Sequence, residues 1–267
     1  MENSLAKPKV TLVLGSGGAR GLAHLGVLKV LKEEAITVTS IIGVSMGAAI
    51  GAYFSLGFDI YELEKYVVSL NKRKAITSLL DLNNPTQSII KGKKLNKFIS
   101  KLLKDSSFSD TKIPLRILGT DLANGEEVIM DRGKLAEAVQ ASIAVPGIFP
   151  PVKRGSGFLV DGGVVNPTPI DLAIKDKPDL IIAVDLTIKR KADIIKPNMV
   201  TTLMQSYEII RTHSVLSNAK HRKKVVMIMP ETRGTIDSFK FHHIEKFIAS
   251  GEKSAKEKIG IIKRRLK

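Results

Sequence analysis

Two short apolar segments, each running into a glycine-containing turn and then a helix, constrain the fold more than any other feature of the sequence. The first, 10–14, is rich in β-branched residues and ends at Gly15-Ser16-Gly17-Gly18, after which leucines recur at helical spacing. The second, 40–44, leads into Ser45 and a helix rich in glycine and alanine. Repeated strand–turn–helix units are typical of a parallel sheet covered by helices. We therefore expect an α/β fold with a three-layer α/β/α arrangement.

The rest of the chain extends this pattern. Further strands are predicted at 115–120, 127–130, 158–160, 180–184 and 225–229, and further helices at 59–70, 95–103, 199–220 and the C-terminus. The 267 residues, 43% of them hydrophobic, suffice for one large domain, and no repeat or linker divides them. Residues 71–94 are expected to form either a mobile flap over a pocket or an ordinary surface loop.

Composition and charge limit the chemistry, the cellular location and the binding partners that we expect. Cysteine is absent, which excludes disulfides, thiolate metal sites and cysteine nucleophiles. No apolar run is long enough to span a bilayer, and residues 1–9 lack a signal-peptide core, so we expect a cytoplasmic protein that is soluble or peripherally bound to a membrane. Residues 187–267 carry +12 of the net charge of +16. Such a region attracts anionic membranes or acidic proteins, and no nucleic-acid module accompanies it.

Gly43-Val44-Ser45-Met46-Gly47 is a G-x-S-x-G motif between a predicted strand and a small-residue helix. This context is typical of a serine nucleophile on a sharp turn, where the helix dipole helps to stabilise a developing alkoxide. The motif also arises by chance, so it does not identify a catalytic serine by itself.

The glycine-rich segment 15–21 also lies between a strand and a helix. Position 20 is arginine rather than glycine, so the dinucleotide fingerprint fails, and no Gly-Lys-Ser/Thr follows to make a Walker A loop. What remains is a set of backbone N–H groups at a helix N-terminus, which suits an anion or an oxyanion. The alternative is a glycine turn that only packs a helix on a strand.

A serine nucleophile needs a base, and the sequence offers two kinds. His213 follows Ser45 and Asp161 in the order that an α/β-hydrolase triad requires, but its predicted helical setting is unusual for that role. His24, His221, His242 and His243 are expected to be packing or surface residues. Asp161 is the other candidate, since it ends a short apolar strand before Gly162-Gly163, although such a segment is also an ordinary turn.

In their order along the chain, these motifs resemble those of the patatin-like phospholipase family, especially its bacterial members. The resemblance covers roughly residues 8–187 and includes the glycine loop with Arg20, the Ser45 motif and Asp161-Gly162-Gly163. It also includes the proline-rich block at 141–151 and the segment 119–126. The chain departs mildly from the family at Ser16, where a third glycine is usual.

The resemblance implies a patatin-like sandwich with a mostly parallel central sheet and a Ser–Asp dyad. Ser45 would attack an acyl ester, and Asp161 would take its proton and later activate water, without a metal or an organic cofactor. The oxyanion would be held by backbone N–H groups of Gly17, Gly18 and Ala19. The expected supporting residues are Arg20, Gly43, Gly47, Gly162 and Gly163.

We therefore expect a serine acyl hydrolase of lipid esters, of phospholipase A, lysophospholipase or esterase type, in residues 8–187. Residues 188–267 are expected to form a basic helix–strand–helix extension packed on the same domain. Its last helix has an apolar stripe flanked by lysines, which suits docking on its own core or binding an anionic bilayer. Two other functions fit the same residues: a non-catalytic binder of lipid or an acidic partner, and an acyltransferase that uses the same serine.

Overall fold

The centre of the protein is a sheet whose strands lie side by side in the order β5-β6-β3-β2-β1-β7-β8, and β4 is also paired to β3. The computed structural model describes residues 7–72, 78–79, 81–83, 88–187, 198–218, 224–231 and 243–267. Within them, the strands are β1 (Val10–Leu14), β2 (Ser40–Val44), β3 (Leu115–Asp121), β4 (Glu127–Met130), β5 (Val152–Arg154), β6 (Gly157–Asp161), β7 (Leu180–Val184) and β8 (Val225–Ile228). The neighbours of β1 and β2 are all parallel to them, as β8 is to β7, whereas β4, β5 and β6 pair antiparallel.

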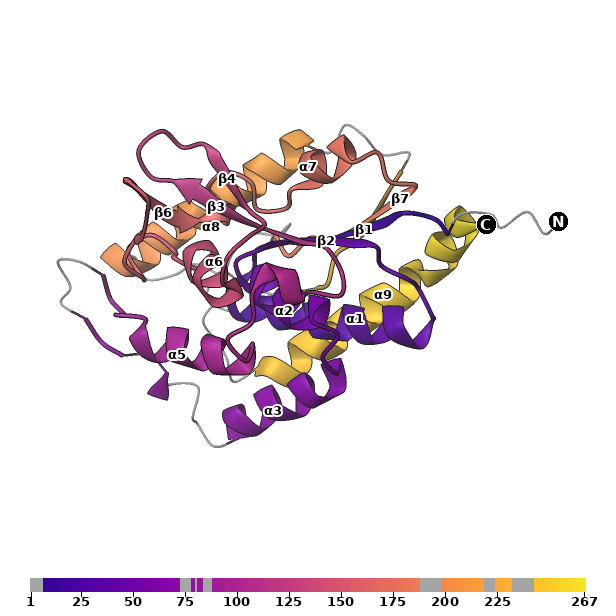
Figure 1. Cartoon of the computed structure of the whole chain (residues 1–267), viewed down its shortest axis with the longest axis horizontal. Coiled ribbons are helices and arrows are strands. Elements are labelled where there is room, and N and C mark those ends of the chain that lie inside the picture. Colours follow the sequence, from indigo (N-terminus) through magenta and orange to yellow (C-terminus); the bar gives the residue numbers. More distant parts are fainter. Residues whose placement is uncertain are drawn as a thin grey trace.

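Helices cover both faces of this sheet (Figure 1). The α-helices are α1 (Ala23–Glu33), α2 (Met46–Ser55), α3 (Ile60–Lys72), α5 (Lys93–Leu102), α6 (Leu135–Ser142), α7 (Ile170–Lys175), α8 (Met199–Asn218) and α9 (Ile244–Leu266). Short 3-10 turns are η1 (Gly18–Leu22), η2 (Phe108–Asp110) and η3 (Gly162–Val164). The predicted three-layer α/β/α sandwich with a mostly parallel sheet is confirmed.

The two faces of the central strands bury two different apolar clusters, because successive side chains of a strand point to opposite faces. Leu12, Leu14 and Ile41 belong to the larger cluster, which includes the inner faces of α1, α2 and α9. Val13 and Ile42, the residues between them, belong to the smaller cluster under α7. Both faces of β1 and β2 are therefore buried, as is typical of interior parallel strands with mainly apolar sequences.

The chain beyond residue 187 returns to the same sheet. Strand β8 extends it beside β7, and α9 packs along α1 with its apolar stripe, which includes Ile244, Ile248 and Ile262, buried. Lys29 on α1 forms ion pairs with Glu64 of α3 at 2.8 Å and with Glu252 of α9 at 2.5 Å. One partly buried lysine therefore joins three helices. The apolar stripe of α9 is thus used by the protein's own core.

Helices α1 and α9 approach so closely that side chains are excluded where they cross. A Cβ added to Gly251 would lie 2.0 Å from the Ala23 carbonyl oxygen, and one added to Gly26 would lie 2.1 Å from the Ile248 carbonyl oxygen. Both obstacles are backbone atoms, which cannot rotate away. The crossing therefore depends on glycine on both helices.

We expect Gly251→Ala to lower the free energy of unfolding by about 3 kcal/mol, the upper end of the usual cost of overpacking, because the helices must separate. Gly260→Ala in the same helix is the matched control: its Cβ would meet only Arg264 Nη1, at 4.0 Å. That control should be neutral or stabilising by up to about 1 kcal/mol, since alanine favours helix. Urea denaturation measures both, and equal stability of the two variants would contradict the close crossing.

Two helices and one strand were not predicted from the sequence. Helix α6 and helix α7 are short, and a helix of six or eight residues offers too few turns for its periodicity to be read. Strand β5 has three residues at the edge of the sheet. Of the segment 71–94, for which the sequence left open a mobile flap or an ordinary surface loop, residues 73–77, 80 and 84–87 lie outside the described part of the chain.

Candidate active site

Ser45 lies at the turn between β2 and α2, in a backbone conformation that ordinary residues rarely adopt. Its φ is +55° and its ψ is −123°, an arrangement that costs on the order of 1–3 kcal/mol and concentrates at functional sites. The Ser45 N–H donates to the Ser142 hydroxyl at 2.8 Å. A Cβ on Gly47 would lie 2.1 Å from the Leu14 carbonyl oxygen, so α2 begins directly against β1. The turn is therefore fixed from both sides.

Strand register brings Asp161 to the level of Ser45. Strand β2 pairs Val44 with Leu118 of β3, and β3 pairs the next residue, Gly119, with Asp161 of β6. Asp161, the last residue of β6, therefore lies at the same edge of the sheet as the end of β2, where Ser45 follows. The two side chains come from strands that flank β3 on either side.

The Asp161 carboxylate is fully buried and only partly hydrogen-bonded. Its Oδ1 accepts the Gly163 N–H at 2.7 Å, and its main-chain oxygen accepts the Thr120 hydroxyl at 3.0 Å. Within the described residues Oδ2 accepts no well-formed hydrogen bond. Catalytic hydrogen bonds are often long before substrate binds, so this arrangement is compatible with the predicted role of Asp161 as a base.

The pKa of Asp161 is raised to about 6, chiefly because burial disfavours the charged carboxylate. The nearby Ser45 hydroxyl, the Gly163 N–H, the charge of Arg211 and the Tyr207 hydroxyl act in the opposite direction. The balance leaves a carboxylate that is ionised at neutral pH and is a better base than an ordinary aspartate. This is the condition that an aspartate base without a histidine requires.

Three oxygen atoms converge over Gly163. A Cβ added there would lie 2.8 Å from the Ser16 hydroxyl, 2.8 Å from the Tyr207 hydroxyl and 3.0 Å from Asp161 Oδ1. Only a residue without a side chain leaves room for this arrangement. Tyr207 belongs to α8 and was not predicted from the sequence as part of the site.

A buried ionic cluster ties α8 to the glycine loop. Arg20 and Arg211 both donate to Glu208 Oε1, each at 2.8 Å, and all three side chains are almost completely buried. Arg211 also donates to the Ser16 carbonyl oxygen at 2.5 Å, and Arg20 Nε to that of Gly17 at 3.4 Å. Buried charges require such partners. The loop conformation is therefore held from α8, a segment for which the sequence predicted only a helix.

The loop itself presents backbone donors beside Ser45. Gly18 lines the cavity described below, and its φ of +56° turns the chain into η1. Within the described residues, the N–H groups of Gly17 and Gly18 have no acceptor. His24 Nε2 lies 2.7 Å from the Gly15 carbonyl oxygen and holds the start of the loop. Burial lowers the pKa of His24 to about 4, so this histidine is neutral.

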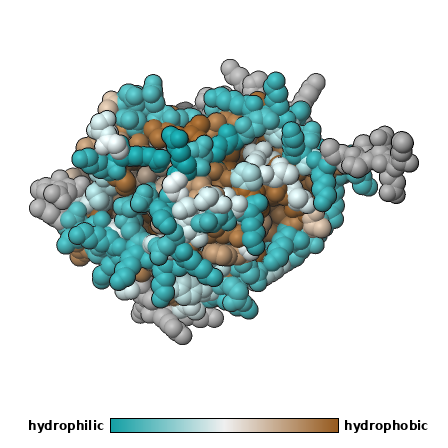
Figure 2. All heavy atoms as spheres, viewed as in Figure 1, coloured by the Kyte–Doolittle hydropathy of each residue, from teal (hydrophilic) through white to brown (hydrophobic). Residues whose placement is uncertain are grey.

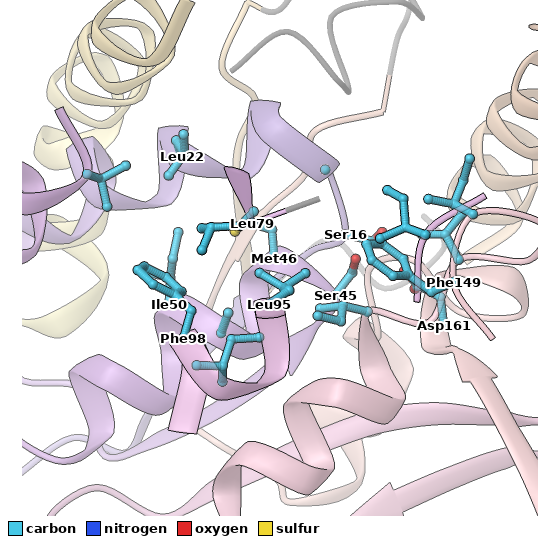
Figure 3. A pocket seen from close by; sticks show the side chains of 18 of the residues that line it. Ser16, Leu22, Ser45, Met46, Ile50, Leu79, Leu95, Phe98, Phe149 and Asp161 are labelled. Carbon is cyan, nitrogen blue, oxygen red and sulfur yellow. The ribbon is translucent and has the colours of Figure 1, made fainter. Parts of the chain in front are cut away.

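A cavity of about 250 Å³ opens from this cluster. Ser16, Ser45 and Asp161 lie at one end, and Ile50, Leu79, Leu95 and Phe98 lie at the other (Figure 3). Tyr207, Glu208 and Arg211 of α8 also line the cavity. The rest of the wall is apolar and comes mainly from η1, α1, α2, α3, α5 and residues 143–149. The cavity thus joins a polar end, where the serine and the aspartate lie, to an apolar channel.

Of the histidines whose side chains the structure describes, His24 and His243, neither lines this cavity. His24 is buried under the glycine loop, and His243 precedes α9, with its ring 6.3 Å from that of Phe247. His221 and His242 lie outside the described residues, as does the side chain of His213 in α8. The Asp161 base and the His213 triad both stay predictions, and Asp161 is the one whose side chain the structure places at the cavity with Ser45.

Comparison with known proteins places this fold and site in a family. Residues 12–174 match the family described as patatin-like phospholipase, which is more than half of the chain. The protein therefore belongs to the patatin-like phospholipase family. Ser45 and Asp161 both lie within the matched residues, whereas α8 lies beyond them.

Individual relatives agree with this assignment. An uncharacterized NTE family protein of Mycobacterium tuberculosis is 36% identical over 181 residues, which are 68% of this chain and 50% of that protein. Neuropathy target esterase sws of Drosophila melanogaster is 35% identical over 189 residues, 69% of this chain and 13% of that protein. The chain thus spans about half, or less, of the length of these curated relatives. The crystal structure of VipD from Legionella pneumophila has the same fold, with a TM-score of 0.53 and 14% identity over 94% of this chain and 66% of that one.

Proposed function

We propose that the protein is a serine acyl hydrolase of lipid esters, of the phospholipase A, lysophospholipase or carboxylesterase type. The observation that carries the proposal is the position of Ser45: a strained serine beside a buried aspartate, at the polar end of an apolar cavity. Family membership supports lipid hydrolysis in general. The Ser45–Asp161 dyad and the lipid ester substrate go beyond what family membership supports, and both are part of the proposal.

In the first half of the reaction, the Ser45 oxygen attacks the ester carbonyl while Asp161 takes the hydroxyl proton. The carbonyl oxygen becomes an oxyanion, and the N–H groups of Gly17, Gly18 and Ala19 are the proposed donors to it. Collapse of the tetrahedral intermediate breaks the ester bond. Asp161 then returns the proton to the departing alcohol, and the acyl group stays on Ser45.

In the second half, water replaces the alcohol. Asp161 takes a proton from this water, and the resulting hydroxide equivalent attacks the acyl-enzyme carbonyl. Collapse releases the carboxylic acid, and the proton held by Asp161 returns to the Ser45 oxygen. The raised pKa of Asp161 suits both directions of transfer, since a group with a pKa near the working pH serves as base and then as acid.

The apolar part of the cavity suits an acyl chain rather than a polar group. Its wall includes Ile50 of α2, Leu63 and Val67 of α3, and Leu95 and Phe98 of α5. An acyl chain bound there is removed from water along its length, which favours binding in proportion to the buried area. The ester carbonyl is then left at Ser45.

A fluorophosphonate probe tests the proposed nucleophile. We expect covalent labelling of the wild-type protein, with the modified peptide containing Ser45, because phosphonylation requires the same activated serine. The labelling rate should fall as the pH is lowered through about 6, by roughly tenfold per unit below it, since protonated Asp161 cannot accept the serine proton. Mass spectrometry identifies the peptide, and gel fluorescence at a series of pH values gives the rate.

Ser142 is the internal control in the same experiment. Its hydroxyl lies 2.8 Å from the Ser45 nitrogen, and it is completely buried. Labelling of any serine other than Ser45, or no labelling of the folded wild-type protein, would contradict the proposal.

A further inference from the structure

Helix α5 has two chemically different faces. Leu95, Phe98, Ile99 and Leu102 line the apolar cavity, and Phe98 stacks on Tyr66 of α3 with ring centroids 5.9 Å apart. At 100° per residue, the lysines of the helix fall within a 100° arc on the opposite side. The lysine face of α5 is defined here as Lys93, Lys94, Lys97 and Lys101, all of which are exposed.

No ion pair among the described residues offsets the charge of this face. Residues 91–104 contain six lysines and no acidic residue. Within the described part of the chain, none of the four lysines of the face forms an ion pair, whereas Lys29, Lys32, Lys65 and Lys263 do. The surface over α5 is correspondingly hydrophilic (Figure 2). A concentrated positive charge without an internal partner attracts an anionic surface.

Apolar side chains are exposed beside these lysines. Leu82 is 76% exposed and forms a bridge with Ile90, which lines the cavity just before α5. Tyr66, which stacks on Phe98, is 42% exposed. Lysines with neighbouring exposed apolar and aromatic groups are the combination found where proteins bind the interface of a charged bilayer.

The basic C-terminal helix is less suited to this role than the sequence indicated. Its apolar stripe is buried against α1, so no apolar face remains for the acyl region of a bilayer. Its cations are interspersed with Glu245, Glu252 and Glu257. No residue of α9 lines the cavity.

We propose that the lysine face of α5 docks the protein on an anionic phospholipid bilayer, with the apolar cavity directly behind it. The charge of the face matches the lipid headgroups, and Leu82 and Tyr66 are placed to contact the region beneath them. Helix α5 would then be the only element between a lipid of the bound bilayer and the part of the cavity that α5 lines. The inference goes beyond the proposed hydrolase activity, and binding is measured without turnover.

The test compares two variants that lose the same charge. In the first, Lys93, Lys94, Lys97 and Lys101 are replaced by Gln; in the control, Lys246, Lys253, Lys256 and Lys267, all exposed on or after α9, are replaced by Gln. Glutamine keeps helix propensity close to that of lysine. Binding is measured by co-sedimentation with vesicles of phosphatidylcholine alone and with 30% phosphatidylserine, a composition chosen here as roughly that of an anionic leaflet.

We expect the wild-type protein to bind the anionic vesicles and not the neutral ones, and to be released at high salt. The α5 variant should lose at least tenfold in partitioning, and the α9 control should lose less than about threefold. Two double variants, Lys93→Gln with Lys97→Gln and Lys94→Gln with Lys101→Gln, should each give an intermediate loss, which separates docking from misfolding. Equal losses in the α5 variant and the control, or no binding of anionic vesicles by the wild type, would overturn the proposal; the latter would leave an acidic protein as the partner of this face.

Hydrolysis of a soluble ester tests the proposed hydrolase activity independently of membrane docking. p-Nitrophenyl butyrate does not require a bilayer, so the α5 variant should hydrolyse it as fast as the wild type. Vesicle binding without ester hydrolysis by the wild type would support the docking face and contradict the hydrolase, whereas hydrolysis without binding would do the reverse.

Discussion

Ser45→Ala is expected to abolish ester hydrolysis, with a fall in turnover of about ten-thousand-fold or more, while the protein stays folded. The methyl group cannot form an acyl-enzyme, and loss of a serine nucleophile typically removes nearly all the chemistry that depends on it. Alanine at φ +55° is as strained as serine, so we expect little change in stability. Initial rates with p-nitrophenyl butyrate and a thermal melt measure the two effects.

Ser45→Gly and Ser55→Ala make this experiment more specific. Glycine also removes the nucleophile but adopts positive φ freely, so it should be inactive and raise stability by about 1–3 kcal/mol through relief of strain. Ser55 is a buried serine at the far end of the same helix, where its hydroxyl donates to the Ala52 carbonyl oxygen. Its replacement should leave turnover within severalfold of the wild type. Activity retained in Ser45→Ala would exclude this serine as the nucleophile.

Asp161→Asn is expected to lower turnover by about 10³- to 10⁴-fold. The amide has nearly the same shape as the carboxylate but cannot accept the Ser45 proton, and a positioned general base contributes about this much. The Gly163 N–H still finds an acceptor in the amide oxygen, so the turn at Gly162-Gly163 should persist. Single-turnover kinetics with the same ester show whether acylation itself is slowed.

Asp185 provides a matched control for this variant. It is also a buried aspartate at the end of a strand, β7, and it accepts hydrogen bonds from Thr168 and Thr187. It does not line the cavity, so Asp185→Asn should change stability more than turnover. Full activity in Asp161→Asn together with its loss in His213→Ala would replace the dyad by a histidine triad.

The central strands and the polar end of the cavity were accessible from the sequence because local patterns determine them. Strands β1, β2 and β7 are short, mainly apolar segments, and their observed bounds are those predicted. Ser45 follows β2, Asp161 is the last residue of β6, and glycines come soon after both. Motifs of this kind fix the position of a side chain at the edge of a sheet before the rest of the fold is known.

The contribution of α8 was not accessible in the same way. Glu208 and Arg211 are three residues apart on a helix, a spacing usual for an exposed ion pair, yet both are buried. Their burial depends on the glycine loop, which is almost two hundred residues away in the sequence. One signal was available: Arg20, between glycines and apolar residues, requires a buried acidic partner that no residue near it supplies.

The attachment of the glycine loop to α8 changes which part of the chain can be transferred to another protein as a unit. The family match ends at residue 174, but Tyr207, Glu208 and Arg211 all line the cavity. A chimera or minimal domain designed from the matched residues alone would leave Arg20 without its carboxylate and Asp161 open to water. Ancestral reconstruction, domain grafting and relatedness searches built on this protein should therefore take the proposed catalytic module to extend at least through Arg211.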